Sequence, residues 1–220
     1  MARLISRARV LALLSVAGLG TAAAVVAVAP RGWAASCSDV EVVFARGSLD
    51  PGIVGNPFAE AVQKALPGKS VIRYDVDYLA DASQMNAGSG ATDMTRHVTS
   101  VAADCPNTTF VLGGYSQGAS VTDIAIGIDT VLGKGEVIPT NLAPRIAAVV
   151  VFGNPLALTG GHIPTASPLY GARAKEFCND GDPVCGNGAD ATAHLSYGFD
   201  GSTTQGGAFA AEKVLASTAG

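Results

Sequence analysis

A serine flanked by glycines is the residue of this sequence best placed to do chemistry. Residues 114–118 read Gly-Tyr-Ser-Gln-Gly, with an apolar run at 110–113 before them and apolar residues at helical spacing from 121 to 132 after them. This order predicts a tight turn from a buried strand into a helix, with Ser116 at its tip. Glycines are needed on both sides, because neighbouring chain passes where a Cβ atom would lie. Ser116 is therefore predicted to be a nucleophile, and the backbone N–H of Gln117 to face the oxyanion that its attack would create.

A serine hydroxyl needs a neighbouring base, and the usual base is a histidine held by a carboxylate. The sequence has three histidines. His97 falls in a predicted helix before the serine strand, on the wrong end of that unit to reach the turn, and is interpreted as a solvated helix residue. His162 lies in a long loop that could approach the turn, but the two glycines before it also suit a simple turn. His194 follows the last predicted strand, and the chain order serine, aspartate, histidine matches hydrolases with this kind of turn. We therefore predict His194 as the base.

Two aspartates lie in the loop after that strand, within Cys-Asn-Asp-Gly-Asp-Pro-Val-Cys at residues 178–185. A disulfide between the two cysteines would leave a carboxylate in this loop little rotational freedom, which suits a group that holds an imidazole in one tautomer. Asp-Gly and Asp-Pro are also common turn dipeptides. The residues alone therefore leave Asp180 and Asp182 as alternatives for the group that orients His194.

The elements that must position these residues alternate between apolar strands and amphipathic helices. Strands are predicted at 40–44, 71–78, 108–112, 146–152 and 174–177, and helices after Asn56, around 94–102, after Ser116 and from Gly206 onward. This alternation is typical of a parallel sheet with helices on both faces. We predict an α/β fold, a three-layer sandwich of the α/β-hydrolase type with a central parallel sheet of about five strands. The loops at 133–144 and 153–171 show no apolar helical stripe, so no lid is expected over Ser116.

The first 35 residues are predicted to be an export signal rather than part of the fold. Arg3, Arg7 and Arg9 precede an uncharged run of mainly alanine, valine and leucine from residue 10 to residue 29. Small residues between about Ala34 and Ser36 allow cleavage there. The run could also serve as an uncleaved membrane anchor, although its glycines and many alanines make it only moderately hydrophobic. Residues 36–220 would form one secreted domain, which could stay associated with the cell envelope.

The charge of the mature chain excludes one class of partner. The full sequence has 14 basic and 18 acidic residues, and loss of the four arginines of the export segment leaves a net charge of −8. A chain this acidic is not expected to bind nucleic acid. About 185 residues are enough for one well-buried domain, which we expect to be a monomer.

Four cysteines in an exported chain indicate two disulfides. Cys37 and Cys105 each come just before a predicted strand, so in a parallel sheet both lie at the amino ends of the strands. Cys178 follows the last strand and lies at the opposite edge. We therefore predict that Cys37 pairs with Cys105 and that Cys178 pairs with Cys185. A zinc site is not expected, because no histidine follows the last two cysteines at ligand spacing.

Four motifs, in this order and at similar spacings, resemble the cutinase family. They are Ala-Arg-Gly-Ser at 45–48, Gly-Tyr-Ser-Gln-Gly at 114–118, Cys-Asn-x-Gly-Asp-x-Val-Cys at 178–185 and His-Leu-x-Tyr-Gly at 194–198. The resemblance runs from Cys37 to about Tyr197.

The resemblance implies a fold, a site and a reaction. It assigns a triad of Ser116, Asp182 and His194, and so chooses Asp182 over Asp180 as the orienting carboxylate. It also implies an oxyanion hole formed by Ser48 and the backbone of Gln117. The implied reaction is hydrolysis of carboxylic esters through an acyl-enzyme, without a cofactor or a metal.

One segment departs from the fungal members of that family. Their chains carry bulky aliphatic residues between the second disulfide and the histidine, where they contact the acyl chain, whereas residues 186–193 here are Gly, Asn, Gly, Ala, Asp, Ala, Thr and Ala. Each missing buried aliphatic side chain removes about 1.5–3 kcal/mol of possible apolar contact. We therefore expect esters with short to medium acyl chains to be preferred.

Two other functions fit the same residues. An acetylxylan esterase is one, because such enzymes resemble the same family and a small polar pocket would suit acetyl groups on sugars. The other is a secreted surface protein that keeps the fold without catalysis, although all three triad residue types occur at the matching motifs. We expect a serine esterase whose substrate is a lipid, a polyester or a small ester.

Overall fold

The structure is a computed structural model that describes residues 37–217. The export segment predicted at residues 1–35 lies outside the described residues, as do residues 218–220 at the other end. Within the described part, no helix is both long and apolar enough to cross a membrane.

Five strands form a parallel sheet, as the sequence predicts. They are β1 (Val40–Ala45), β2 (Val71–Asp75), β3 (Thr109–Tyr115), β4 (Ile146–Phe152) and β5 (Ala174–Phe177). Their order across the sheet is β2-β1-β3-β4-β5, so β3, which leads to Ser116, lies in the centre. Because all five strands run in the same direction, their carboxyl ends meet at one edge, which we call the carboxyl edge.

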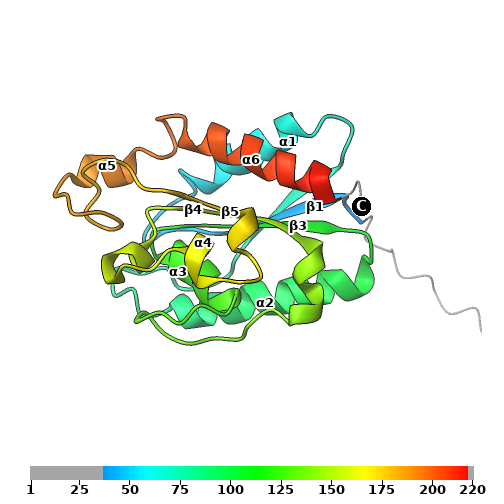
Figure 1. Cartoon of the computed structure of the whole chain (residues 1–220), viewed down its shortest axis with the longest axis horizontal. Helices are drawn as coiled ribbons and strands as arrows, with labels where there is room; N and C mark the ends of the chain where they lie inside the picture. The colour runs from blue at the N-terminus through cyan, green and yellow to red at the C-terminus, as the bar shows by residue number, and fades with distance from the viewer. Residues whose placement is uncertain (1–36, 218–220) are drawn as a thin grey trace, which may run out of the picture. The chain divides into compact units, whose positions relative to one another are not determined.

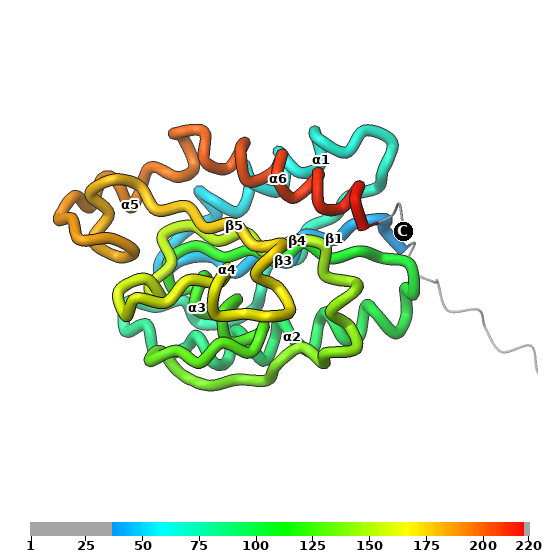
Figure 2. Tube along the Cα trace, in the orientation of Figure 1, coloured from blue at the N-terminus to red at the C-terminus, as the bar shows by residue number. Residues whose placement is uncertain are grey.

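Helices cover both faces of this sheet (Figure 1, Figure 2). One face carries α1 (Gly55–Ala65) and α6 (Ser202–Ser217), and the other carries α2 (Ala87–Asp104) and α3 (Gln117–Ala125). Short helices lie in the connections: η1 (Thr140–Arg145), η2 (Pro155–Thr159), α4 (Ile163–Ala166), η3 (Gly171–Arg173) and α5 (Ala191–Leu195). The arrangement is the three-layer α/β sandwich predicted from the sequence.

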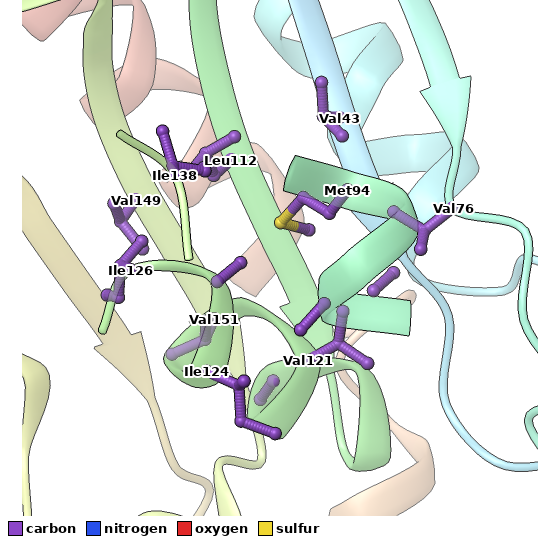
Figure 3. Close-up of a cluster of buried hydrophobic side chains, with 14 of the residues drawn as sticks. Val43, Val76, Met94, Leu112, Val121, Ile124, Ile126, Ile138, Val149 and Val151 are labelled. Carbon is purple, nitrogen blue, oxygen red and sulfur yellow. The ribbon is translucent and has the colours of Figure 1, made fainter. Parts of the chain in front are cut away.

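The central strands bury side chains on both faces, which explains why they read as apolar runs in the sequence. In β1, Val43 packs toward α2 and α3, while its neighbour Phe44 packs toward α1 and α6. On the first side, Val43 and Leu112 of the sheet meet Met94 of α2 and Val121 of α3 (Figure 3). Packing on both faces holds the strands in place, and with them the strand ends that carry the site.

Several elements differ from the sequence prediction. α1 begins at Gly55, before Asn56, and β3 continues to Tyr115 instead of ending at residue 112. β2 ends at Asp75 instead of residue 78, and the N–H of Asp77 donates to the Asp93 carboxylate of α2 at 2.8 Å. α3 ends at Ala125, although apolar residues continue at helical spacing to residue 132, because the chain turns at Gly127 with a φ of +84° that favours glycine. The short helix α5, which carries His194, was not predicted.

Both predicted disulfides are confirmed. Cys37 and Cys105 are bonded at the amino ends of β1 and β3, with their Cα atoms 5.5 Å apart. Cys178 and Cys185 are bonded across the loop after β5, with their Cα atoms 5.7 Å apart. The first disulfide ties the start of the sheet to the end of α2, and the second closes the loop that carries Asp182.

Close packing of α6 on α1 yields a stability prediction. A Cβ atom on Gly207 would lie 2.5 Å from the Cβ atom of Ala61 and 2.8 Å from its backbone carbon. Alanine is favoured over glycine in a helix by about 1 kcal/mol, but this clash has no flexible group that could move aside. We expect Gly207→Ala to lower the free energy of unfolding by about 1–3 kcal/mol in urea denaturation. Gln205→Ala, an exposed change on the same helix, should stay within about 0.5 kcal/mol of the parent protein. A Gly207→Ala protein as stable as the parent would contradict this account of the helix pair.

Candidate active site

The strand-to-helix turn at Ser116 has the geometry that its sequence predicts. Ser116 stands between β3 and α3 with φ = +55° and ψ = −120°, a conformation rare for residues other than glycine. A Cβ atom on Gly114 would lie 2.1 Å from the carbonyl oxygen of Gly118, and one on Gly118 would lie 2.0 Å from that of Ala45. The ends of β1 and β3 and the start of α3 are therefore packed backbone to backbone, and they hold Ser116 at the carboxyl edge.

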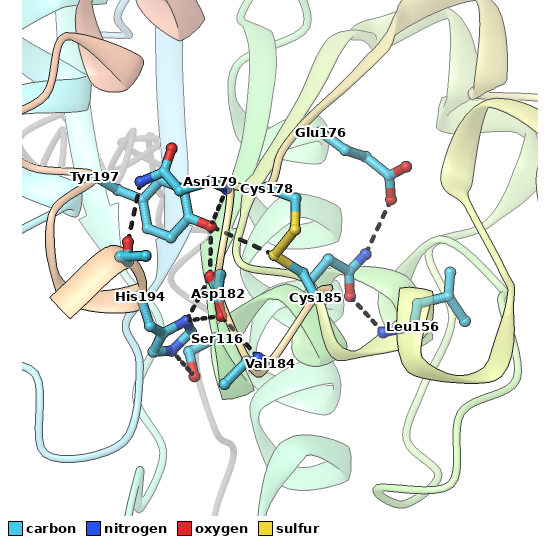
Figure 4. The surroundings of a disulfide bond; sticks show 12 residues. Ser116, Leu156, Glu176, Cys178, Asn179, Asp182, Val184, Cys185, His194 and Tyr197 are labelled. Atoms are coloured by element: carbon cyan, nitrogen blue, oxygen red, sulfur yellow. Dashed lines mark hydrogen bonds and ion pairs between the residues drawn. A yellow bond between two sulfur atoms is a disulfide. The ribbon is translucent and has the colours of Figure 1, made fainter. Parts of the chain in front are cut away.

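Ser116, His194 and Asp182 form one chain of hydrogen-bonded side chains (Figure 4). Ser116 Oγ lies 3.0 Å from Nε2 of His194. The other ring nitrogen, Nδ1, lies 2.9 Å from Oδ2 of Asp182 and 3.0 Å from its Oδ1. The three residues come from the end of β3, from α5 and from the loop after β5. The structure thus brings together the three residues that the motifs indicate.

Asp182 is a fully buried carboxylate with donors on both oxygens. Besides the contacts with His194, its Oδ1 accepts the backbone N–H of Val184 at 2.7 Å, and its Oδ2 accepts the hydroxyl of Tyr197 at 2.5 Å. Burial raises the pKa of Asp182, but hydrogen bonds from Tyr197, His194 and Val184 outweigh burial and hold this pKa below its ordinary value. Asp182 is therefore ionised at neutral pH, where it can orient His194 and stabilise its protonated form.

The residues weighed against these three lie elsewhere. Asp180 is exposed to solvent. The interpretation of His97 as a solvated residue is wrong, because its side chain is only 19% exposed and its Nε2 lies 2.7 Å from Oε1 of Glu41, a buried residue of β1. His162 pairs with Glu176, with 3.0 Å between Nδ1 and Oε2. Each alternative histidine thus has a carboxylate partner away from Ser116.

Ser48 and Gln117, the predicted oxyanion-hole residues, contact each other beside Ser116. Gln117 is the first residue of α3, and the first N–H groups of a helix have no partner inside that helix. The hydroxyl of Ser48 donates to Oε1 of Gln117 at 2.9 Å. A hydroxyl can turn its hydrogen toward a nearby anion while its oxygen stays in place. The arrangement therefore offers one backbone donor and one side-chain donor at the edge where Ser116 lies.

A cavity of about 240 Å³ opens beside Ser48. Its wall is mainly apolar and includes Leu49, Ile53, Val54 and Leu195. Residues 186–193, predicted to form the wall that contacts the acyl chain, are not among the described residues that line it. The apolar surface next to Ser48 comes instead from the loop after β1 and from α5.

Two tyrosines complete the site and were not predicted as site residues. Tyr115, next to the nucleophile, donates its hydroxyl to the backbone carbonyl of His194 at 2.8 Å, and the two rings lie 5.0 Å apart. Tyr197 donates to Asp182, as described above. Each tyrosine stands inside a motif that carries the family resemblance, so the signal for both is their place beside the serine and the histidine.

Comparisons with known proteins agree with this geometry. A family model described as Cutinase matches residues 36–214. A cutinase of Kineococcus radiotolerans is 54% identical over 188 residues, which cover 83% of this chain and 64% of that protein. The chain therefore spans slightly less than two thirds of that relative's length. Carboxylesterase Culp1 of Mycobacterium tuberculosis is 37% identical over 188 residues, which cover 81% of this chain and 82% of that one.

A solved structure gives the same result. Trichoderma reesei cutinase in complex with a C11Y4 phosphonate inhibitor superposes with a TM-score of 0.65 and 34% identity, covering 81% of this chain and 77% of that chain. The family model extends over all five strands and over every residue of the site described above. This chain belongs to the cutinase family of serine esterases.

Proposed function

We propose that this protein hydrolyses carboxylic esters through an acyl-enzyme formed on Ser116. The observation that carries the proposal is the chain of hydrogen bonds from Ser116 through His194 to the buried carboxylate of Asp182. A serine hydroxyl becomes an effective nucleophile when a neighbouring imidazole can take its proton. The names of the relatives, a cutinase and a carboxylesterase, support the same reaction here.

Acylation begins when Ser116 Oγ attacks the carbonyl carbon of the ester. His194 Nε2 takes the hydroxyl proton as the new C–O bond forms, and Asp182 stabilises the resulting imidazolium. The carbonyl oxygen becomes an oxyanion, which accepts the N–H of Gln117 and the hydroxyl of Ser48. Ser48 gives up its hydrogen bond to Oε1 of Gln117 at this step. His194 then gives the proton to the alkoxy oxygen, the C–O bond to it breaks, and the alcohol leaves.

Deacylation repeats these steps with water in place of the serine. His194 takes a proton from the water as its oxygen attacks the acyl carbon, and returns that proton to Ser116 Oγ as the carboxylic acid leaves. The proposed mechanism uses neither a metal nor a cofactor. The site also argues against a surface protein without turnover, because packing alone does not require a serine in a strained backbone conformation within hydrogen-bond distance of an imidazole that is paired with a carboxylate.

Replacing each of the two aspartates by asparagine, in separate variants, tests the triad. Asp182→Asn removes the charge that orients His194 and should lower kcat by about 10⁴-fold. Asp180→Asn is the same chemical change at an exposed position two residues away, and should leave kcat close to that of the parent. Rates are measured on a soluble butyrate ester, with Ser116→Ala as the inactive reference and circular dichroism as the check on folding. Equal losses in the two asparagine variants, or full activity in Ser116→Ala, would contradict the assignment.

A preference for short to medium acyl chains is the second part of the proposal. The cavity beside Ser48, with its apolar wall and its volume of about 240 Å³, would cover a few methylene groups. Residues 186–193 are small and largely exposed, include three polar side chains, and offer little apolar surface beyond it. Each methylene adds up to about 0.8 kcal/mol only while an apolar wall covers it. The gain per carbon should therefore end where the cavity ends.

A series of p-nitrophenyl esters from acetyl to palmitoyl measures this preference. We expect kcat/KM to rise over the first carbons and to level off or fall by about eight carbons. Ile53→Ala, which removes part of the cavity wall, should weaken the preference for butyrate over acetate, whereas the matched change Ile72→Ala on the edge strand β2 should leave the series unchanged. Palmitoyl esters hydrolysed faster than butyryl esters would refute the preference. Faster turnover of acetylated xylan than of any soluble ester would instead favour an acetylxylan esterase.

We further propose that residues 1–35 direct export and are removed, which leaves a secreted monomer. The arginines followed by an uncharged apolar run support this proposal, and so do the two disulfides, since disulfides persist in oxidising compartments. The proposed signal contains Trp33, which is the only tryptophan of the sequence.

The position of Trp33 makes cleavage easy to detect. Protein purified from the culture medium should show tyrosine fluorescence without tryptophan emission, because cleavage after Ala34 or Ala35 removes the tryptophan. The full-length chain made without export is the positive control. Tryptophan emission from the secreted protein would place the cut before residue 33, and tryptophan-containing protein confined to membranes would refute removal of the segment.

A further inference from the structure

Tyr197 is a fully buried tyrosine whose hydroxyl lies within the loop that carries Asp182 (Figure 4). The hydroxyl oxygen is 2.5 Å from Oδ2 of Asp182, 3.0 Å from the backbone nitrogen of Asn179 and 3.4 Å from Sγ of Cys185. The ring stands edge-on to the imidazole of His194, with the ring centres 6.2 Å apart. One side chain therefore contacts the acid, the base and the disulfide of the site.

The chemistry of the partners decides the direction of these hydrogen bonds. The backbone N–H of Asn179 can only donate, so the hydroxyl oxygen of Tyr197 accepts from it. The hydroxyl hydrogen is then free for Asp182, whose ionised carboxylate can only accept. An oxygen–oxygen distance of 2.5 Å is typical of a charge-assisted bond from a hydroxyl to a carboxylate. Burial and the hydrogen bond to Asp182 raise the pKa of Tyr197, so the hydroxyl keeps its proton at the pH values at which an esterase is assayed.

We propose that Tyr197 is a positioning residue of the triad. Its hydroxyl holds the Asp182 carboxylate in the orientation that faces His194, and it sets how strongly Asp182 and His194 together retain a proton. The inference rests on the function proposed above. Of the donors to Asp182, Val184 belongs to the same loop and His194 is the base itself. Tyr197 comes from the segment after α5, so it links the loop that carries Asp182 to the segment that carries His194.

Loss of the hydroxyl should change the pH dependence in one direction. A carboxylate that loses a donor binds a proton more strongly, and it also stabilises a neighbouring imidazolium more strongly. Protonated His194, which cannot act as a base, would then persist to higher pH. The acid limb of kcat/KM should therefore move to higher pH. KM for a small soluble ester should stay unchanged, because the buried Tyr197 does not line the cavity beside Ser48.

The experiment compares Tyr197→Phe with Tyr170→Phe. Tyr170 is also fully buried, and its hydroxyl has no hydrogen-bond partner among the described residues, so its loss is a matched control for removing a phenol oxygen from the interior. On a soluble butyrate ester, we expect Tyr197→Phe to lower kcat by about 10- to 100-fold, the size of effect seen when a hydrogen-bond partner that orients a metal ligand is lost. The acid limb of its kcat/KM profile should move to higher pH by about half a pH unit or more. Tyr170→Phe should change neither quantity.

A second substitution covers the case in which Tyr197→Phe does not fold. Incorporation of 3-fluorotyrosine at position 197 keeps the ring and the hydroxyl but makes the hydroxyl a stronger donor, so the acid limb should move to lower pH. Proton NMR should detect the same changes. The signal of the imidazole N–H that donates to Asp182 should change with pH at higher pH in Tyr197→Phe and at lower pH with 3-fluorotyrosine.

Two results would overturn the inference. One is a folded Tyr197→Phe protein with unchanged kcat, and the other is an acid limb that moves in neither substituted protein. If Ser116→Ala is inactive in the same assays, either result removes only the role of Tyr197 and leaves ester hydrolysis at this site in place. Full activity in Ser116→Ala would remove the proposed function itself.

Discussion

The buried negative charge of Asp182 is the constraint around which the chain after β5 is arranged. A carboxylate taken out of water costs several kcal/mol unless donors surround it. Here the donors come from the loop itself at Val184, from α5 at His194 and from the following segment at Tyr197. The second disulfide closes the loop and so holds the Asp182 carboxylate in one orientation, in which all three donors reach it. The short helix α5 and the turns around it are explained by this requirement more than by packing in the core.

The other half of the site depends on the parallel sheet. Parallel strands deliver their carboxyl ends to one edge, where β1 leads to Ser48 and β3 leads to Ser116. The register pairs Ala45 with Gly114, so these two strand ends are level, and the absence of a side chain on Gly118 allows α3 to begin against them. The sheet thus presents Ser116, Ser48 and Gln117, while the chain after β5 brings His194 and Asp182. His194 joins the two halves, since it contacts both Ser116 and Asp182.

Features that follow from local patterns or from the direction of the strands could be predicted from the sequence, and contacts that leave no such pattern could not. Buried apolar runs identified the five strands, their direction identified the disulfide pairs, and glycines identified the turn at Ser116. The interpretation of His97 failed because nothing near it in the sequence shows that Glu41 of β1 lies opposite. The choice between Asp180 and Asp182 needed the resemblance to a family, since only the folded loop shows which aspartate is buried. The apolar wall beside Ser48 was also missed, because the loop after β1 has no periodic pattern.

At position 116, the backbone conformation makes stability and activity favour different residues. A residue other than glycine in this conformation costs about 1–3 kcal/mol, and the proposed reaction requires a serine there. Glycine at position 116 would relieve that strain, whereas a side chain at Gly114 or Gly118 would collide with backbone. In a lineage that had lost the need for the reaction, selection for stability alone would therefore replace the serine and retain the glycines around it. Such selection would remove Ser116 before it removed the turn that presents it.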